Sequence, residues 1–275
     1  MQNIHSTERE NVFNIAQSQN YAVDNPSTII PNNALDRECL SIRKKLVKKY
    51  LGFGAKILEI GPGGGDFLRW AADEGYQLSV IEESAMIAEK LMGVTNANVF
   101  VGRFEENSFE NDTQDAICSF HVIEHVVEPK KHLEEALRLV RPGGLAFIAT
   151  PNSQSWSQRV LTSLSPHFDS AHIRIFSHTS LRKLAVDSGW EIVDLQTPEY
   201  TSAFLRLLSK ALRRIRREDE EETAGKYSKV ESNLARKILI FLIFVSSPIR
   251  HLISKLRFGN EIFLVVRRPV VVSLH

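Results

Sequence analysis

The chain has 275 residues, enough for one large domain or for one domain with an appendage. Hydrophobic residues make up 43% and charged residues 24%, which excludes a chain that is disordered over its whole length. The two cysteines, Cys39 and Cys118, exclude a disulfide-stabilised scaffold and lack CxxC spacing. We therefore expect reduced thiols in a cytoplasmic protein.

Charge is unevenly distributed, although the net charge is only +1. Residues 203–275 contain 15 Lys and Arg against 7 Asp and Glu, a net charge of +8, whereas residues 1–202 carry −7. A basic end on an acidic body predicts a negatively charged partner, such as an anionic membrane surface or a nucleic acid. The first 20 residues are polar and lack an apolar core, so we expect no signal peptide.

Short apolar runs alternate with amphipathic segments along most of the chain. Helices are expected over 36–50, 66–74, 84–92, 129–139 and 178–188. Strands are expected over 56–60, 77–82, 98–101, 115–120, 145–150, 190–195 and 261–267, with a turn at 141–144. The alternation predicts an α/β fold, a Rossmann-like doubly wound sheet with helices on both faces. Ligands of such sheets bind beyond the carboxyl ends of the strands.

A glycine-rich stretch, Gly61-Pro62-Gly63-Gly-Gly65, follows the first expected strand. It fits neither the GxGxxG fingerprint of dinucleotide-binding proteins nor a P-loop. Glycines let the backbone approach a ligand closely. Glu82 ends the second strand about 20 residues later, where a carboxylate can accept hydrogen bonds from ribose hydroxyls. The alternative interpretation is a plain tight turn followed by a solvated acid.

Four stretches in this order resemble the motifs of class I S-adenosylmethionine-dependent methyltransferases. They are Ile57-Leu-Glu-Ile-Gly-Pro-Gly-Gly-Gly, Val80-Ile-Glu, Asp115-Ala-Ile-Cys-Ser-Phe-His-Val-Ile-Glu-His-Val and Leu139-Val-Arg-Pro-Gly-Gly. The resemblance covers about residues 50–200 and the last strand, and it implies a seven-stranded sheet whose last strand is antiparallel. It also implies S-adenosylmethionine as cofactor.

The resemblance further assigns cofactor contacts by position. The methionine part would be held by Glu59 and the loop residues Gly61, Pro62, Gly63 and Gly65, the ribose by Glu82, the adenine by Arg103 and Phe104, and the sulfonium end by Phe120 and His121. Many relatives have Asp just after the third strand, where this chain has Arg103.

Methyl transfer from a sulfonium needs a nucleophile held in line, about 3–3.5 Å from the methyl carbon. For a hydroxyl acceptor a base helps, and the ordinary pKa of histidine suits that task. His172 and His125 are the catalytic candidates, and His167 and Asn152 are candidate substrate ligands. Asn152 is equally consistent with a turn residue after a proline.

The pattern His121-Val-Ile-Glu124-His125 also matches the HxxEH motif of metalloproteases, but it straddles a strand end and not a helix. It partly resembles the metal-binding cluster of methyltransferases that modify small RNAs, with His121 where they have Glu. We assign no metal, although two histidines and a glutamate could bind a divalent ion.

Residues 203–258 interrupt the alternation before the last strand. They combine a basic amphipathic helix with the apolar run 238–245, which is too short to span a bilayer. We expect three parts: an N-terminal helical segment 1–50, a methyltransferase domain of 51–202 with 259–275, and the helical insert 203–258. The insert is interpreted as a peripheral membrane anchor, with packing on the body or formation of a homodimer as alternatives.

These observations predict a cytoplasmic S-adenosylmethionine-dependent methyltransferase at a membrane. The expected reaction is O-methylation of a small, lipid-linked or glycan-linked acceptor. RNA methylation, assisted by a metal at a 2′-hydroxyl, is the alternative enzyme reaction, although we do not expect nucleic acid as a partner. A cofactor-binding protein without catalysis is the third hypothesis.

Overall fold

The computed structural model describes residues 34–93, 95–161, 172–200, 245 and 247–270. In this part of the chain seven strands form one sheet in the order β3-β2-β1-β4-β5-β7-β6. The strands are β1 Lys56–Ile60, β2 Gln77–Glu82, β3 Asn98–Val101, β4 Gln114–Phe120, β5 Val140–Pro151, β6 Glu191–Gln196 and β7 Glu261–Arg267.

The strands β1, β2, β3, β4 and β5 pair in parallel with their neighbours, and β7 runs antiparallel between β5 and β6. The chain order reverses beside β1, so the carboxyl ends of β1 and β4 flank a topological switch point. The antiparallel β7 begins at Glu261 opposite Pro151, which ends β5. The first residue of β7 therefore lies at the same edge as the carboxyl ends of the parallel strands.

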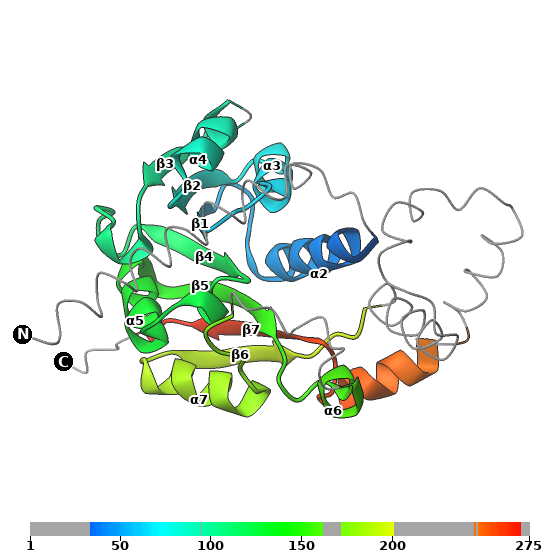
Figure 1. Cartoon of the computed structure of the whole chain (residues 1–275). Coiled ribbons are helices and arrows are strands. Elements are labelled where there is room, and N and C mark those ends of the chain that lie inside the picture. Colours follow the sequence, from blue (N-terminus) through cyan, green and yellow to red (C-terminus); the bar gives the residue numbers. More distant parts are fainter. Residues whose placement is uncertain (1–33, 94, 162–171, 201–244, 246, 271–275) are drawn as a thin grey trace, which may run out of the picture.

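Helices cover both faces of the sheet (Figure 1). They are α2 Ala34–Tyr50, α3 Asp66–Asp73, α4 Ala85–Met92, α5 Pro129–Leu139, α6 Trp156–Leu161 and α7 His178–Asp187, with 3-10 turns η2 Phe104–Glu106 and η3 Ile123–His125. On one face Leu46, Val47 and Phe67 of α2 and α3 pack on Ile57 of β1. On the other, α5 and α7 pack on the alternate strand residues. This alternation is what a sheet buried on both sides requires.

The structure confirms the seven strands and the antiparallel last strand. The turn predicted at Arg141–Gly144 is wrong, because β5 already begins at Val140. The backbone there is paired with the end of β7: Gly143 N–H donates to Arg268 O, and Arg268 N–H donates to Gly144 O, both at 2.9 Å. A side chain at Gly144 would lie 2.8 Å from Asp115 O, so glycine permits this close pairing.

The short helix α6 is an element that the sequence does not reveal. It has only six residues, follows Pro151, and begins where Trp156 N–H donates to Phe258 O at 2.9 Å. A contact across about a hundred residues thus fixes its start. The proposed division into three parts stays a prediction, because most of the insert, 203–244 and 246, lies outside the described residues.

Candidate functional site

The glycine loop joins the end of β1 to the start of α3. Gly61 N–H donates to Ile81 O, and Gly65 N–H donates to Pro62 O, both at 2.9 Å, which closes a tight bend. Gly61, Gly63 and Gly65 have φ angles of 60°, 53° and 72°, in the left-handed region that favours glycine. Glycines at these positions let a ligand at the carboxyl edge approach the loop backbone closely.

Glu82 ends β2 next to this loop, and only 9% of the residue is accessible to solvent. Its Oε1 accepts a hydrogen bond from Ser84 N–H at 2.9 Å, while Ser84 caps α4. Burial raises the pKa of Glu82, and the bond from Ser84 opposes that rise. The carboxylate is held by its backbone neighbours at the strand end, as its predicted contact with a ribose requires.

Arg103 and Phe104 follow β3, where the resemblance places the adenine. Arg103 is exposed and is the N-cap residue that precedes η2. Phe104 is only 4% accessible, and its ring packs on His132 with 4.6 Å between ring centroids. Phe104 is therefore a core residue beneath this edge, and its predicted contact with adenine is not supported by its position.

Glu59 projects from β1 into the face that α2 covers, and it is almost fully buried. Its Oε2 has no hydrogen-bond partner among the described residues. Burial raises the pKa of Glu59 to about 8, against the opposing charge of Arg43. A cationic group of a ligand bound beside Glu59 would favour its ionised form and pair with it.

Arg43 of α2 is a site residue that the sequence analysis missed. Its guanidinium carbon lies 4.5 Å from the centre of the Phe120 ring, at the end of β4. Its Nε is buried without a hydrogen-bond partner within the described ranges. The sequence shows Arg43 only as one of many basic residues in an amphipathic helix, so no local signal distinguishes it.

His121 follows Phe120 and has a φ angle of 58°, which is uncommon for a residue with a side chain. Its Nε2 lies 2.6 Å from Glu261 Oε1, and its Nδ1 lies 3.2 Å from Glu124 Oε1. Both carboxylates are buried, whereas 41% of the imidazole is accessible. Burial alone would lower the pKa of His121, but Glu261 and Glu124 outweigh it and raise the pKa to about 9.

Glu261 is a second residue that the sequence analysis missed. It begins β7, and Tyr200 donates a hydrogen bond to its other carboxylate oxygen. The strained backbone of His121 is held by this ion pair and by a 2.8 Å hydrogen bond from its N–H to Ala149 O. Such over-determined strain is typical of functional sites.

The two catalytic candidates are brought together. The rings of His125 and His172 lie 5.0 Å apart between centroids, and each offers a nitrogen close to the Glu124 carboxylate. Their segments are joined by a 3.1 Å hydrogen bond from Arg174 N–H to Glu124 O. His121 is engaged by Glu261 and Glu124, whereas His172 lies beside Glu124 and His125.

Of the two candidate substrate ligands, the structure describes Asn152 but not His167. Asn152 is fully buried, and its amide donates to Gly259 O at 2.8 Å and accepts from Gln154 N–H at 3.0 Å. It therefore fixes the start of β7 against the end of β5, and its predicted contact with substrate is not supported. His167 lies outside the described residues.

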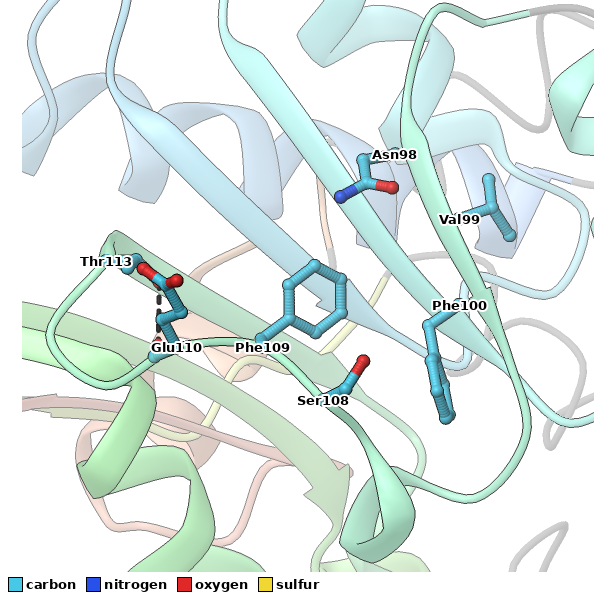
Figure 2. Close-up of a pocket in the computed structure, with 7 residues that line it drawn as sticks. All are labelled: Asn98, Val99, Phe100, Ser108, Phe109, Glu110 and Thr113. Atoms are coloured by element: carbon cyan, nitrogen blue, oxygen red, sulfur yellow. Dashed lines mark hydrogen bonds between the residues drawn. The ribbon is translucent and has the colours of Figure 1, made fainter.

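A shallow hollow of about 350 Å³ lies elsewhere, between β3 and the segment that leads into β4 (Figure 2). Its lining includes Asn98, Phe100, Phe109 and Thr113, near the amino ends of these strands. Figure 2 shows the phenyl rings beside it and the 2.9 Å hydrogen bond from the Thr113 hydroxyl to Glu110 O. It holds none of the predicted site residues, so the carboxyl edge remains the candidate site.

Comparisons with known proteins identify the family of the chain. The family described as "Methyltransferase domain" matches residues 32–195. A probable S-adenosylmethionine-dependent methyltransferase of Mycolicibacterium smegmatis is 27% identical over 51% of this chain and 54% of its own length. A ubiquinone biosynthesis O-methyltransferase of Cronobacter sakazakii is 27% identical over 40% of this chain and 48% of its own length. The chain thus spans about half the length of these relatives.

A solved structure supports the fold over a longer stretch. An S-adenosylmethionine-dependent methyltransferase from Archaeoglobus fulgidus superposes with a TM-score of 0.53 at 18% identity, covering 83% of this chain and 94% of the other. At this identity the likeness concerns the fold alone. The family match, which covers more than half of the chain, goes further: the chain belongs to the methyltransferase-domain family.

Proposed function

We propose that this protein is an S-adenosylmethionine-dependent methyltransferase that transfers the methyl group to a hydroxyl of a small acceptor. The observation that carries the proposal is the group of imidazoles and carboxylates at the carboxyl edge, directly after the strand that ends at Phe120. A hydroxyl must lose its proton during transfer, and such groups can assist that loss. The ubiquinone biosynthesis O-methyltransferase among the relatives supports the same class of acceptor atom.

The cofactor is proposed to lie along the edge from β4 to β3. Its carboxylate would meet Arg43, and its ammonium would meet Glu59. Arg43 is a partly buried cation and Glu59 a buried acid, and Arg43 Nε and Glu59 Oε2 have no hydrogen-bond partner among the described residues. The glycine loop would pass beneath the methionine part of the cofactor, and Glu82 would accept hydrogen bonds from the ribose hydroxyls. Arg103 would cover the adenine, and the sulfonium would lie beside the Phe120 ring.

This arrangement assigns most of the rate acceleration to positioning. The cofactor carries its own leaving group, so the protein must hold the acceptor oxygen in line with the carbon–sulfur bond and keep water out. His125 and His172 lie on the acceptor side of His121 and would act on the acceptor hydroxyl. Replacing either by Asn should lower turnover and leave the affinity for S-adenosylhomocysteine nearly unchanged.

The acceptor is further proposed to be lipid-linked and reached at the cytoplasmic surface of a membrane. Support comes from the helical segment 247–255 and its flanks, where Val245, Ile249, Leu252 and Leu256 are each more than half exposed. Their spacing of four, three and four residues places them on one helix face, as in helices that lie in a membrane interface. None of the described helices is both long enough and apolar enough to cross a bilayer.

Flotation with anionic phosphatidylglycerol vesicles tests the membrane proposal. Leu252→Glu should release the protein from the vesicles, whereas Val186→Glu should not, because Val186 is equally exposed but lies on α7. Flotation that is the same for both variants would contradict a membrane role of this face.

Transfer of a labelled methyl group separates the candidate functions. Label from S-adenosylmethionine should enter a lipid extract or a small-molecule pool. Label in RNA would favour the alternative enzyme reaction. Bound cofactor with no transfer to any pool would favour a binding protein and contradict the proposed O-methylation.

A further inference from the structure

Three metal-ligating side chains converge beside His121. Glu124, His125 and His172 each offer one ligand atom, and these atoms all lie within 4.8 Å of one another. Glu124 and His125 come from the 3-10 turn η3 after β4, and His172 comes from the segment that precedes α7. Because these parts of the chain are almost 50 residues apart, the local sequence does not bring the imidazoles together.

The backbone and its neighbours hold the group in place. The 3.1 Å hydrogen bond from Arg174 N–H to Glu124 O fixes the segment of His172 against η3. The buried Glu124 carboxylate accepts a 2.9 Å hydrogen bond at Oε2 from the Thr150 hydroxyl, at the end of β5. Outer contacts of this kind orient a carboxylate that binds a metal.

We propose that Glu124, His125 and His172 bind one divalent transition-metal ion. Two imidazoles and one carboxylate are a donor set suited to Zn²⁺, Co²⁺ or Fe²⁺, whereas Mg²⁺ and Ca²⁺ prefer oxygen donors throughout. Three protein ligands leave at least one coordination position for water or a substrate oxygen, as in catalytic metal sites.

The position of the site indicates what the ion would do. The turn η3 begins two residues after His121, so the ion would lie at the carboxyl edge on the acceptor side. A hydroxyl bound to it would lose its proton more easily, because a cation stabilises the oxygen anion. This role rests on the proposed O-methylation, whereas the binding site itself does not.

Metal binding is measured first, on the full chain after removal of metals by EDTA. Titration calorimetry with Zn²⁺ alone should give about one equivalent, and Co²⁺ should give a visible absorption band. His125→Asn and His172→Asn should each weaken Zn²⁺ binding at least about tenfold. His251→Asn is the matched control, since His251 is an exposed histidine on the segment 247–255 and should bind as the original protein does.

Thermal melting and binding of S-adenosylhomocysteine show that each variant is folded. Folded variants that still bind Zn²⁺ as tightly as the original chain would overturn the proposal, as would an original chain that binds no Zn²⁺. These outcomes do not depend on methyl transfer. If the metal site is confirmed, removal of the ion should slow O-methylation at least about tenfold, with restoration by Zn²⁺ or Co²⁺; an unchanged rate would overturn the role toward the acceptor.

Discussion

The Nε2 atom of His121 lies 2.6 Å from the Oε1 atom of Glu261, which joins the end of β4 to the start of β7. The two residues are 140 positions apart, and β5 lies between their strands in the sheet. The antiparallel direction of β7 makes this contact possible, because it brings the first residue of β7 to the carboxyl ends of the parallel strands. The last strand therefore contributes a charged group to the candidate site.

Glu261→Gln should lower the pKa of His121, because it removes the carboxylate that lies 2.6 Å from the imidazole. A raised histidine pKa stabilises the fold fully below the ordinary pKa of 6.5, and this contribution is lost as the pH rises through about 9. The free energy of unfolding of the variant should be about 1–2 kcal/mol lower than that of the original chain at pH 6, and the difference should be smaller at pH 10. The cost is modest because the imidazole is partly exposed.

Two measurements on metal-free protein check this prediction. Histidine resonances followed by NMR should show one ring that titrates near pH 9 in the original chain and lower in the variant. The matched control is Glu134→Gln, which removes an exposed carboxylate 3.1 Å from Lys130 and should leave that titration unchanged. An imidazole pKa that does not differ between the original chain and Glu261→Gln would refute the ion pair.

Glu59 should couple cofactor binding to the release of a proton. Its pKa is raised to about 8 by burial, so it is largely protonated at pH 7 without ligand. A bound ammonium group would favour the ionised acid, and the affinity for S-adenosylhomocysteine should therefore rise between pH 6.5 and 8.5. Calorimetry in buffers of different ionisation enthalpy counts the released proton. Glu59→Gln should bind with no such pH dependence, and an equal dependence in both proteins would argue against this role.

Arg43→Ala should weaken binding of S-adenosylhomocysteine about tenfold or more, because it removes a partly buried cation proposed to pair with the cofactor carboxylate. The comparison is Lys44→Ala on the same helix, whose ammonium lies 5.5 Å from the centre of the Trp70 ring. Calorimetry should show nearly unchanged affinity for that variant. Similar losses in both would indicate a general effect of helix charge and not a specific contact.

The fold could be predicted because its information is local. The central strands β4, β5 and β7 are mostly buried, so they appear in the sequence as short apolar runs, and Gly61 and Gly65 mark the loop after the first strand. The turn expected at Arg141–Gly144 failed because its glycines serve pairing with Arg268, near the other end of the chain. The turn preference of neighbouring residues cannot reveal a strand partner that lies more than 100 residues away in the sequence.

The candidate site could be predicted only in part, for the same reason. The positions of Glu82 and His125 follow from strand ends, which the sequence reveals. Tertiary packing brings Arg43 and Glu261 to the site, so the residues beside them in the sequence do not indicate that they belong to it. The role of Asn152 stayed open in the sequence, because its position at a strand end is shared by residues that bind ligands and by residues that fix the backbone.

Calorimetric titration of the original chain and of Glu82→Ala with S-adenosylhomocysteine tests most directly where the cofactor lies. We predict saturable binding with a stoichiometry near one, weakened by about 1–3 kcal/mol in the variant, which leaves the ribose hydroxyls without their buried acceptor. Equal affinity of the two proteins would contradict the placement of the cofactor between the glycine loop and the end of β2.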